Sequence, residues 1–492
     1  MNVLLVYPEF PETFWSFKKA LEFIGKKAAS PPLGLLTIAA MLPKEWNLKL
    51  IDLNVNPLLD EDISWADMVF ISAMLVQQKS AGEVIERVKK VDKKIVAGGP
   101  LFSTQPDLFV VDHVFINEAE DCLSLFLNDL EREETRSLYK SKEKPLVTEV
   151  PVPLWSLINF SDYTSIPLQY SRGCPHNCDF CDITVMYGHK VRVKTPTQMI
   201  KEFNSLYQAN WRGPVFLVDD NFIGNKKQVK IMLRELIKWQ KARKYPFKLL
   251  TEASVDLASD QELMRLMSQA NFHKVFLGIE TPHLESLKGC QKYQNTRMDL
   301  KEAVKVIHQH GMQVMGGFIV GFDEDPPSIF EAQIQFIQEV GIVTAMVGLL
   351  VALPRTKLWH RLKKEGRILE NTSGDNTDGS LNFIPRMKRE DLINGYKEIL
   401  STIYGQPDLY YQRIHAFLKN YQPTHRGRFN FAGLMAFFRS IWRIGILSKS
   451  RFLYWKLFFK TLFTKIKCLP VALEMAIYGQ HFERVTKRVL NK

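Results

Sequence analysis

The chain has few cysteines and no long apolar run, and both shortages narrow the class of protein. Six cysteines in 492 residues do not describe a disulfide scaffold. No window approaches the ~20 continuous apolar residues that are needed to span a bilayer. The first seven residues lack the basic leader of a signal peptide and instead predict a buried strand. We therefore expect a cytoplasmic protein.

Acidic residues are scarce at the C-terminal end. Of the 65 basic and 53 acidic residues, 14 and 2 lie between residues 421 and 492, so the first 420 residues hold 51 of each and are neutral. The net charge of +12 therefore lies in residues 421–492, which we call the tail. It indicates the kind of partner that the tail binds and not the partner of the whole protein.

Short apolar runs alternate with helical patterns over residues 1–135. This alternation predicts an α/β domain with a parallel, doubly wound (Rossmann-like) sheet. Ligands of such sheets bind beyond the carboxyl ends of the strands. Asp52, Asn54, Gly98 and Gly99 stand at the ends of two predicted strands. The predicted strands are residues 3–7, 48–53, 68–72 and 94–97.

A polar stretch separates this region from two others. Residues 136–160, rich in Lys, Glu and Ser and ending in spaced prolines, predict a linker. Residues 161–370 predict a partial (β/α)6 barrel, and residues 371–492 predict a mainly helical, basic and aromatic domain. The predicted barrel strands are residues 167–170, 214–218, 248–251, 274–277, 313–319 and 347–351.

Half of the cysteines lie within eight residues of one another, at Cys174, Cys178 and Cys181. Such a cluster favours a metal site in a reducing compartment, and soft sulfur ligands suit iron–sulfur or zinc. A structural zinc would need a fourth ligand, and the candidates His176 and His189 lack the paired spacing of a zinc finger. Three thiolates can instead hold one corner of a cubane cluster and leave one iron open.

This loop, with an aromatic residue before its last cysteine, resembles the C-x-x-x-C-x-x-C signature of the radical S-adenosylmethionine (SAM) superfamily. The resemblance implies a [4Fe-4S] cluster on Cys174, Cys178 and Cys181. It also implies that SAM binds the open iron and is cleaved by one electron to a 5′-deoxyadenosyl radical.

Three strand-end motifs, at residues 218–222, 276–281 and 316–322, occur in the order that this family uses around SAM. The resemblance implies that Asp220, Glu280 and Gly317 are neighbours of SAM. Read singly, Asp220 and Glu280 are as well explained by a capping or salt-bridging role.

The N-terminal region resembles the cobalamin-binding domain of B12-dependent radical SAM proteins, through motifs at residues 31–35, 52–54, 98–100 and 117–121. A Gly-Gly turn lets backbone amides approach a bulky ligand closely. The resemblance implies that Asp52, Asn54, Gly98 and Gly99 contact cobalamin. Asn54 stands where a common cobalamin pattern has its cobalt-binding histidine, which implies a cobalamin without a histidine lower ligand. The alternative is a degenerate domain that is kept for packing.

Residues 382–387 and the basic end resemble the C-terminal domain of one branch, which includes hopanoid and bacteriochlorophyll methylases. The resemblance implies a cobalamin-dependent C-methyltransferase for an unactivated carbon of a lipid, an isoprenoid or a similar small molecule. It also implies an external electron donor such as flavodoxin or ferredoxin. Two alternatives remain: an oxidative cyclase or rearrangement enzyme without methyl transfer, and an RNA-modifying enzyme, although nucleic acid is not the expected partner.

Aromatic and basic residues interleave in the tail. Trp455, Phe458, Phe459, Leu462 and Phe463 recur at spacings of three and four, which predicts one apolar helical face with lysines around it. Such a helix can lie on the inner face of the membrane, as a peripheral contact with anionic headgroups. The alternatives are a helix packed on the barrel and an RNA contact.

Overall fold

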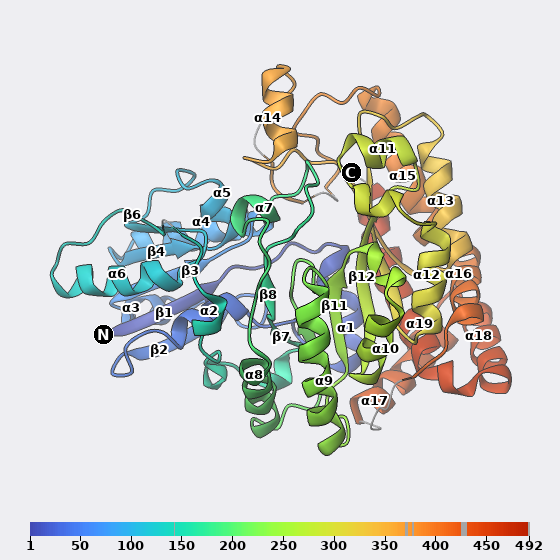
Figure 1. The fold of residues 1–492 in the computed structure, drawn as a ribbon, viewed down its shortest axis with the longest axis horizontal. Coiled ribbons are helices and arrows are strands. Elements are labelled where there is room, and N and C mark those ends of the chain that lie inside the picture. The colour runs from blue at the N-terminus through green and yellow to red at the C-terminus, as the bar shows by residue number, and fades with distance from the viewer. Residues whose placement is uncertain (142, 370–371, 376–377, 425–430, 491–492) are drawn as a thin grey trace.

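The computed structural model describes residues 1–141, 143–369, 372–375, 378–424 and 431–490. Figure 1 shows two sheets side by side, with a layer of helices from the C-terminal part of the chain against the second sheet. The predicted fold class, a Rossmann-like sheet followed by a partial barrel and a helical region, is confirmed.

The first sheet is fully parallel, with the order β2-β1-β3-β4-β5-β6. Alternate residues of β1 face opposite sides, so that Val3 and Leu5 enter one core and Leu4 and Val6 the other. Both faces are therefore buried, as a doubly wound sheet requires. Its strands are β1 (Asn2–Tyr7), β2 (Asn47–Asp52), β3 (Met68–Ser72), β4 (Lys94–Gly98), β5 (His113–Ile116) and β6 (Leu138–Lys140). Its helices are α2 (Leu33–Ala39), α3 (Asp60–Trp65), α4 (Gln78–Lys89), α5 (Pro100–Thr104) and α6 (Glu120–Glu131).

The second sheet is also parallel and has six strands in the order β14-β13-β12-β11-β10-β7. The six-strand partial barrel is thereby confirmed, with β7 and β14 as its edges. Its strands are β7 (Ile166–Leu168), β10 (Val215–Leu217), β11 (Leu249–Ala253), β12 (Phe272–Glu280), β13 (Gln313–Val320) and β14 (Thr344–Leu349). The main connecting helices are α8 (Pro196–Gln208), α9 (Lys226–Ala242), α10 (Gln261–Gln269), α11 (Leu284–Gly289), α12 (Leu300–Gln309) and α13 (Ile329–Val340).

The C-terminal part is helical, as predicted, and shares one continuous core with the second sheet. A short N-terminal helix, α1 (Lys18–Ile24), packs against α17 and α19 although it lies more than 400 residues away in the sequence. The helices are α14 (Lys357–Lys364), α15 (Arg389–Gly405), α16 (Pro407–Asn420), α17 (Phe431–Ser440), the π-helical segment η8 (Ile441–Ile446), α18 (Arg451–Thr464) and α19 (Leu469–Leu490).

The stretch predicted as a linker, residues 136–160, begins with the edge strand β6, which pairs with β5. The first sheet therefore extends beyond residue 135, and the boundaries 161–370 and 371–492 stay predictions. None of the described helices has the length and hydropathy to span a membrane.

Candidate cofactor site between the two sheets

The three cysteines lie in a loop that is held by a small antiparallel hairpin of β8 (Ser171–Arg172) and β9 (Arg192–Val193), with α7 (Ile183–Met186) between them. The loop starts at Gly173, whose φ is +94°. A Cβ at this position would lie 2.9 Å from the carbonyl oxygens of Gly188 and Lys190. Only glycine therefore allows this turn into the cysteine loop.

The three cysteine residues are partly buried, and amide side chains reach the thiols of two of them. Asn221 Nδ2 donates to Cys174 Sγ over 3.8 Å, and Gln294 Nε2 donates to Cys178 Sγ over 3.4 Å. Burial raises the pKa of Cys174, and burial together with Asp182 raises the pKa of Cys181 well above its usual value. A bound cationic cluster would reverse this penalty, because it stabilises thiolates.

Among the described residues, no three His, Cys, Asp or Glu side chains form a site for a single metal ion. His176 and His189 accordingly complete no zinc site with the cysteines. A cubane differs from a single ion, because each cysteine binds a different iron and the sulfurs surround the cluster. The donor set of one loop with three soft ligands therefore fits an iron–sulfur cluster rather than zinc.

Asp220 lies beside this loop. The amide N–H of Gly173 donates to its carboxylate, and its Oδ2 is buried without a hydrogen-bond partner in the described part of the chain. Burial and the neighbouring Asp219 raise the pKa of Asp220 to about 7. An unsatisfied buried acceptor is costly, so this oxygen fits a polar group of a bound ligand such as SAM.

Asp219 has a different role from its neighbour. Its carboxylate accepts hydrogen bonds from the backbone N–H of Tyr170, at 3.2 Å, and from the backbone and side chain of Ser171. The acid thus fixes the entry into the hairpin.

Glu280 reaches the other side of the cysteine loop through Lys292, with which it forms a buried ion pair. Burial would lower the pKa of Lys292, but Glu280 and then Cys178 outweigh it and raise that pKa. The ammonium also lies 5.8 Å from the centre of the Phe180 ring. Glu280 therefore has a salt-bridging role in this structure, and its partner is a cation next to the cysteine loop.

Gly317 lies one strand further away, opposite Gly278 in the β12–β13 register. A Cβ at Gly317 would come within 2.8 Å of the Phe276 ring. Packing of that ring therefore explains the glycine, and no described contact links it to the cysteine loop.

A cavity of about 600 Å³ lies between the first sheet and the beginning of the barrel. Asn54, Gly98 and Gly99 line it from the carboxyl ends of strands of the first sheet, as predicted, whereas Asp52 does not. From the barrel side it is lined by residues of β7, β8, the end of α7 and the β10 region, among them Pro167, Gln169, Arg172, Phe216 and Tyr187, which directly follows α7.

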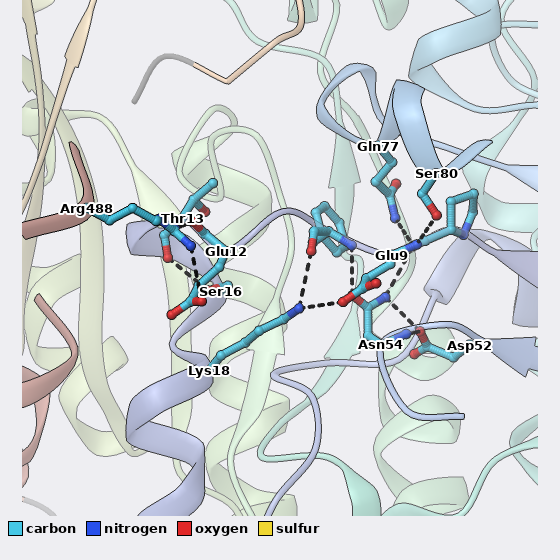
Figure 2. A network of polar contacts seen from close by, with 12 residues as sticks. Glu9, Glu12, Thr13, Ser16, Lys18, Asp52, Asn54, Gln77, Ser80 and Arg488 are labelled. Carbon is cyan, nitrogen blue, oxygen red and sulfur yellow. Dashed lines mark hydrogen bonds and ion pairs between the residues drawn. The ribbon is translucent and has the colours of Figure 1, made fainter. Parts of the chain in front are cut away.

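Asp52 lies behind Asn54 and orients it. One carboxylate oxygen of Asp52 accepts hydrogen bonds from the backbone N–H and the side-chain amide of Asn54, at 2.9 and 2.7 Å, and the other accepts one from Tyr163 at 3.0 Å. Asn54 in turn accepts a bond from the Phe10 N–H at 2.9 Å and donates one to the Pro8 carbonyl at 3.2 Å (Figure 2). Both ends of the Asn54 amide therefore hold the segment that follows β1.

Gly99 allows the backbone to turn at the cavity wall. Its φ is +89°, and a Cβ there would lie 2.8 Å from Ser72 Oγ and 2.9 Å from the Ala73 carbonyl oxygen. Residues that carry a side chain rarely adopt this backbone conformation. The close backbone approach expected of the Gly-Gly turn is thus built into the cavity.

A buried ion network joins the cavity to the cysteine hairpin. Glu118 contacts Arg172 at 2.7 Å and Arg192 at 2.7 and 2.9 Å, and Glu120 contacts Arg172 at 2.6 Å. Burial alone would raise the pKa of Glu120, but Arg172 outweighs it and lowers that pKa. Sequence reasoning noted the acidic motif but missed both arginines, because nothing local pairs positions 54 and 74 residues apart.

Three sequence profiles cover most of the chain: the B12 binding domain matches residues 27–127, the radical SAM superfamily residues 168–337, and the domain of unknown function DUF4070 residues 356–492. The chain is 42% identical over 489 residues to an uncharacterized methyltransferase of Synechocystis, which covers 98% of this chain and 91% of the relative. It is 32% identical over 503 residues to a hopanoid C-2 methylase of Rhodopseudomonas palustris, which covers 98% and 94%. The chain belongs to the B12-binding radical SAM proteins with a DUF4070 domain.

This family assignment confirms the resemblances drawn from the sequence. The protein is a cobalamin-dependent radical SAM methyltransferase, with a [4Fe-4S] cluster, SAM and cobalamin as cofactors and a small molecule as substrate. The solved radical SAM methyltransferase TsrM from Kitasatospora setae shares the fold, with a TM-score of 0.62 at 12% identity over 97% of this chain and 99% of that one. The individual cofactor ligands stay predictions.

Proposed function

We propose that this methyltransferase places a methyl group on an unactivated carbon of a lipid or isoprenoid. The observation that carries the proposal is the similarity to a hopanoid C-2 methylase, because it extends over the C-terminal helices as well as both cofactor domains.

In this proposal Cys174, Cys178 and Cys181 bind the cluster, and Asp220 and Glu280 flank the place for SAM. When bound, the cofactors supply hydrogen-atom removal and a methyl group. The protein itself positions them: the unpartnered oxygen of Asp220 accepts a hydrogen bond from a ligand, and the ion pair of Glu280 holds a cation close to Cys178.

We place cobalamin in the cavity lined by Asn54, Gly98 and Gly99, without a histidine beneath cobalt. In support, both ends of the Asn54 amide are already engaged by the segment after β1. Electron paramagnetic resonance of bound cob(II)alamin should therefore show no nitrogen splitting from a protein ligand. Nitrogen splitting that persists when cobinamide, which lacks the benzimidazole base, replaces cobalamin would contradict the assignment.

The substrate proposal is tested with anaerobic protein that holds cluster and cobalamin. We would supply SAM with a labelled methyl group, a flavodoxin or ferredoxin system as the external electron donor, and a detergent-dispersed hopanoid. The expected result is labelled lipid together with both S-adenosylhomocysteine and 5′-deoxyadenosine, and no product from the Cys178→Ala variant. Label that appears only in a water-soluble acceptor would refute the lipid assignment, and deoxyadenosine without S-adenosylhomocysteine would argue against methyl transfer.

A further inference from the structure

Exposed aromatic side chains are concentrated in one short part of the chain. Among the described residues seven large aromatic side chains are exposed, and five of them lie between residues 438 and 463. Phe463 is 80% exposed and Phe452 74%. An apolar patch of this kind on a folded protein marks an interaction site. The five, which we call the aromatic face, are Phe438, Trp442, Phe452, Phe459 and Phe463.

Helix α18 presents apolar residues on two opposite sides. Tyr454, Leu457 and Thr461 are buried against the neighbouring helices, whereas Phe452, Phe459 and Phe463 follow one another at spacings of seven and four and point to the opposite side. The prediction of a single apolar face on this helix is therefore wrong in detail. Packing on the core uses one side of α18 and leaves a second apolar side uncovered.

The aromatic face continues from α18 to α17 through a row of ring contacts. Phe463 lies 6.4 Å from Phe459, Phe459 lies 5.3 Å from Phe458, and Phe458 lies 6.0 Å from Phe437, which adjoins Phe438. Three of the exposed rings, Phe438, Phe459 and Phe463, thus belong to one continuous row on two helices rather than to separate loops. In Figure 1, α18 lies at the right-hand edge of the molecule, away from the first sheet, and α17 lies at the lower edge.

The charged residues of the chain segment that carries this surface have one sign. No acidic residue occurs between positions 431 and 473. Lys449, Arg451, Lys456, Lys460 and Lys467 are exposed, and none has a carboxylate partner among the ion pairs of the described residues. Lys456 lies on the same side of α18 as Phe452 and Phe459, so that cations and rings alternate there.

We propose that the aromatic face docks on an anionic membrane surface, with its rings among the headgroups and its cations against the lipid phosphates. Interleaved rings and cations without acids match the composition of interfacial helices. A second copy of the same face is disfavoured, because it would bring like charges together. The inference rests on the proposed function, because the purpose of the docking would be access to a lipid acceptor.

The same surface is tied to the cavity wall. Arg439 of α17 donates to the carbonyl oxygens of Glu22 and Phe23 at 3.2 and 3.0 Å, and Arg443 forms a 2.9 Å ion pair with Glu22. These contacts fasten the docking helix to the last turn of α1. The segment that follows α1 lines the cavity from Lys27 to Leu35. Helix α17, which carries Phe438, is therefore connected through α1 to the segment that forms part of the cavity wall.

The test is flotation of the full-length protein with vesicles of phosphatidylcholine, with and without one-third phosphatidylglycerol. We expect the wild type to float with the anionic vesicles. A Phe452→Ser, Phe463→Ser double variant should lose more than ten-fold in binding, and a Lys456→Glu, Lys460→Glu variant should lose the preference for anionic lipid. These four side chains are exposed, and unchanged thermal unfolding would verify that the fold is intact.

The matched control is Trp65→Ser, Tyr293→Ser, which removes two exposed aromatic rings elsewhere and should leave flotation unchanged. A wild type that stays at the bottom with anionic vesicles would overturn the proposal, and so would a double variant that floats like the wild type. Binding of RNA, or dimerisation lost in the double variant, without vesicle binding would also overturn it. Methylation of detergent-dispersed lipid is scored separately: vesicle binding without lipid methylation contradicts the proposed substrate but leaves the docking surface standing.

Discussion

Glu118→Gln is expected to loosen the hairpin that carries the cysteine loop. The Glu118 side chain is 2% exposed, and its carboxylate compensates the positive charges of two arginines, Arg172 and Arg192. In the variant Arg172 keeps Glu120, but Arg192 retains only backbone carbonyl partners. Breaking a buried pair by removing one partner costs about 3–5 kcal/mol. Because one of the two arginines stays paired, we expect the lower end of this range, about 3 kcal/mol.

A chain with several domains need not unfold in one step, so a local measurement is required. Hydrogen exchange of the apoprotein should become about 100-fold faster over residues 171–193, since every 1.4 kcal/mol corresponds to a factor of ten, while α9 is unchanged. The control is Glu235→Gln, which removes an exposed ion pair with Lys238 and should cost less than about 1 kcal/mol. Equal effects of the two variants, or unchanged exchange over 171–193, would refute the reasoning.

Three further outcomes are expected. Gly99→Ala should lower the stability of the apoprotein by about 2 kcal/mol or more, because the backbone conformation and the close contacts of Gly99 leave no room for a side chain. Gly34→Ala is the control: a Cβ at Gly34 has no atom within 4 Å, so this variant should be neutral or stabilising. Thermal unfolding of the two variants measures the difference. Burial and nearby carboxylates raise the pKa of Glu252 to about 8, so the folded state binds this proton more tightly than the unfolded state, and the resulting stability is present at low pH and lost as the pH rises through about 8. The melting temperature of Glu252→Gln should therefore fall less between pH 6 and 9 than that of the wild type, and parallel curves would contradict this. Cys178→Ala should abolish iron binding after reconstitution. Cys290 is a buried thiol outside the loop, so Cys290→Ala should still bind iron. The iron content of each reconstituted variant checks both expectations.

The strands and the cysteine loop could be predicted because their signals are local. Apolar runs such as residues 3–7 and 313–319 specify buried parallel strands by composition alone, and three cysteines within eight residues specify a soft ligand set without any tertiary information. Gly98 and Gly99 were recognised for a similar reason, because a Gly-Gly turn after a strand allows a close backbone approach whatever surrounds it.

The roles of the acids were less accessible. Asp219 and Asp220 are neighbours in the sequence, yet one is saturated by the backbone of the hairpin and the other keeps a buried oxygen without a partner. Composition does not distinguish them, because the difference depends on which way each side chain points at the end of β10. Asp52 likewise stands at the end of a strand, as predicted, but serves to orient Asn54 instead of lining the cavity.

The sequence by itself determined the fold class, the cluster loop and the cofactor family, since each depends on residue types at short spacings along the chain. Only the tertiary structure decided that Glu118 joins Arg172 to the cavity, that Lys292 pairs Glu280 beside the cysteines, and that α18 keeps one aromatic side uncovered. The physical reason is that burial and charge pairing are set by residues brought together from distant parts of the chain. A helical pattern shows which residues share a side, but it does not show which of its sides the rest of the protein will cover.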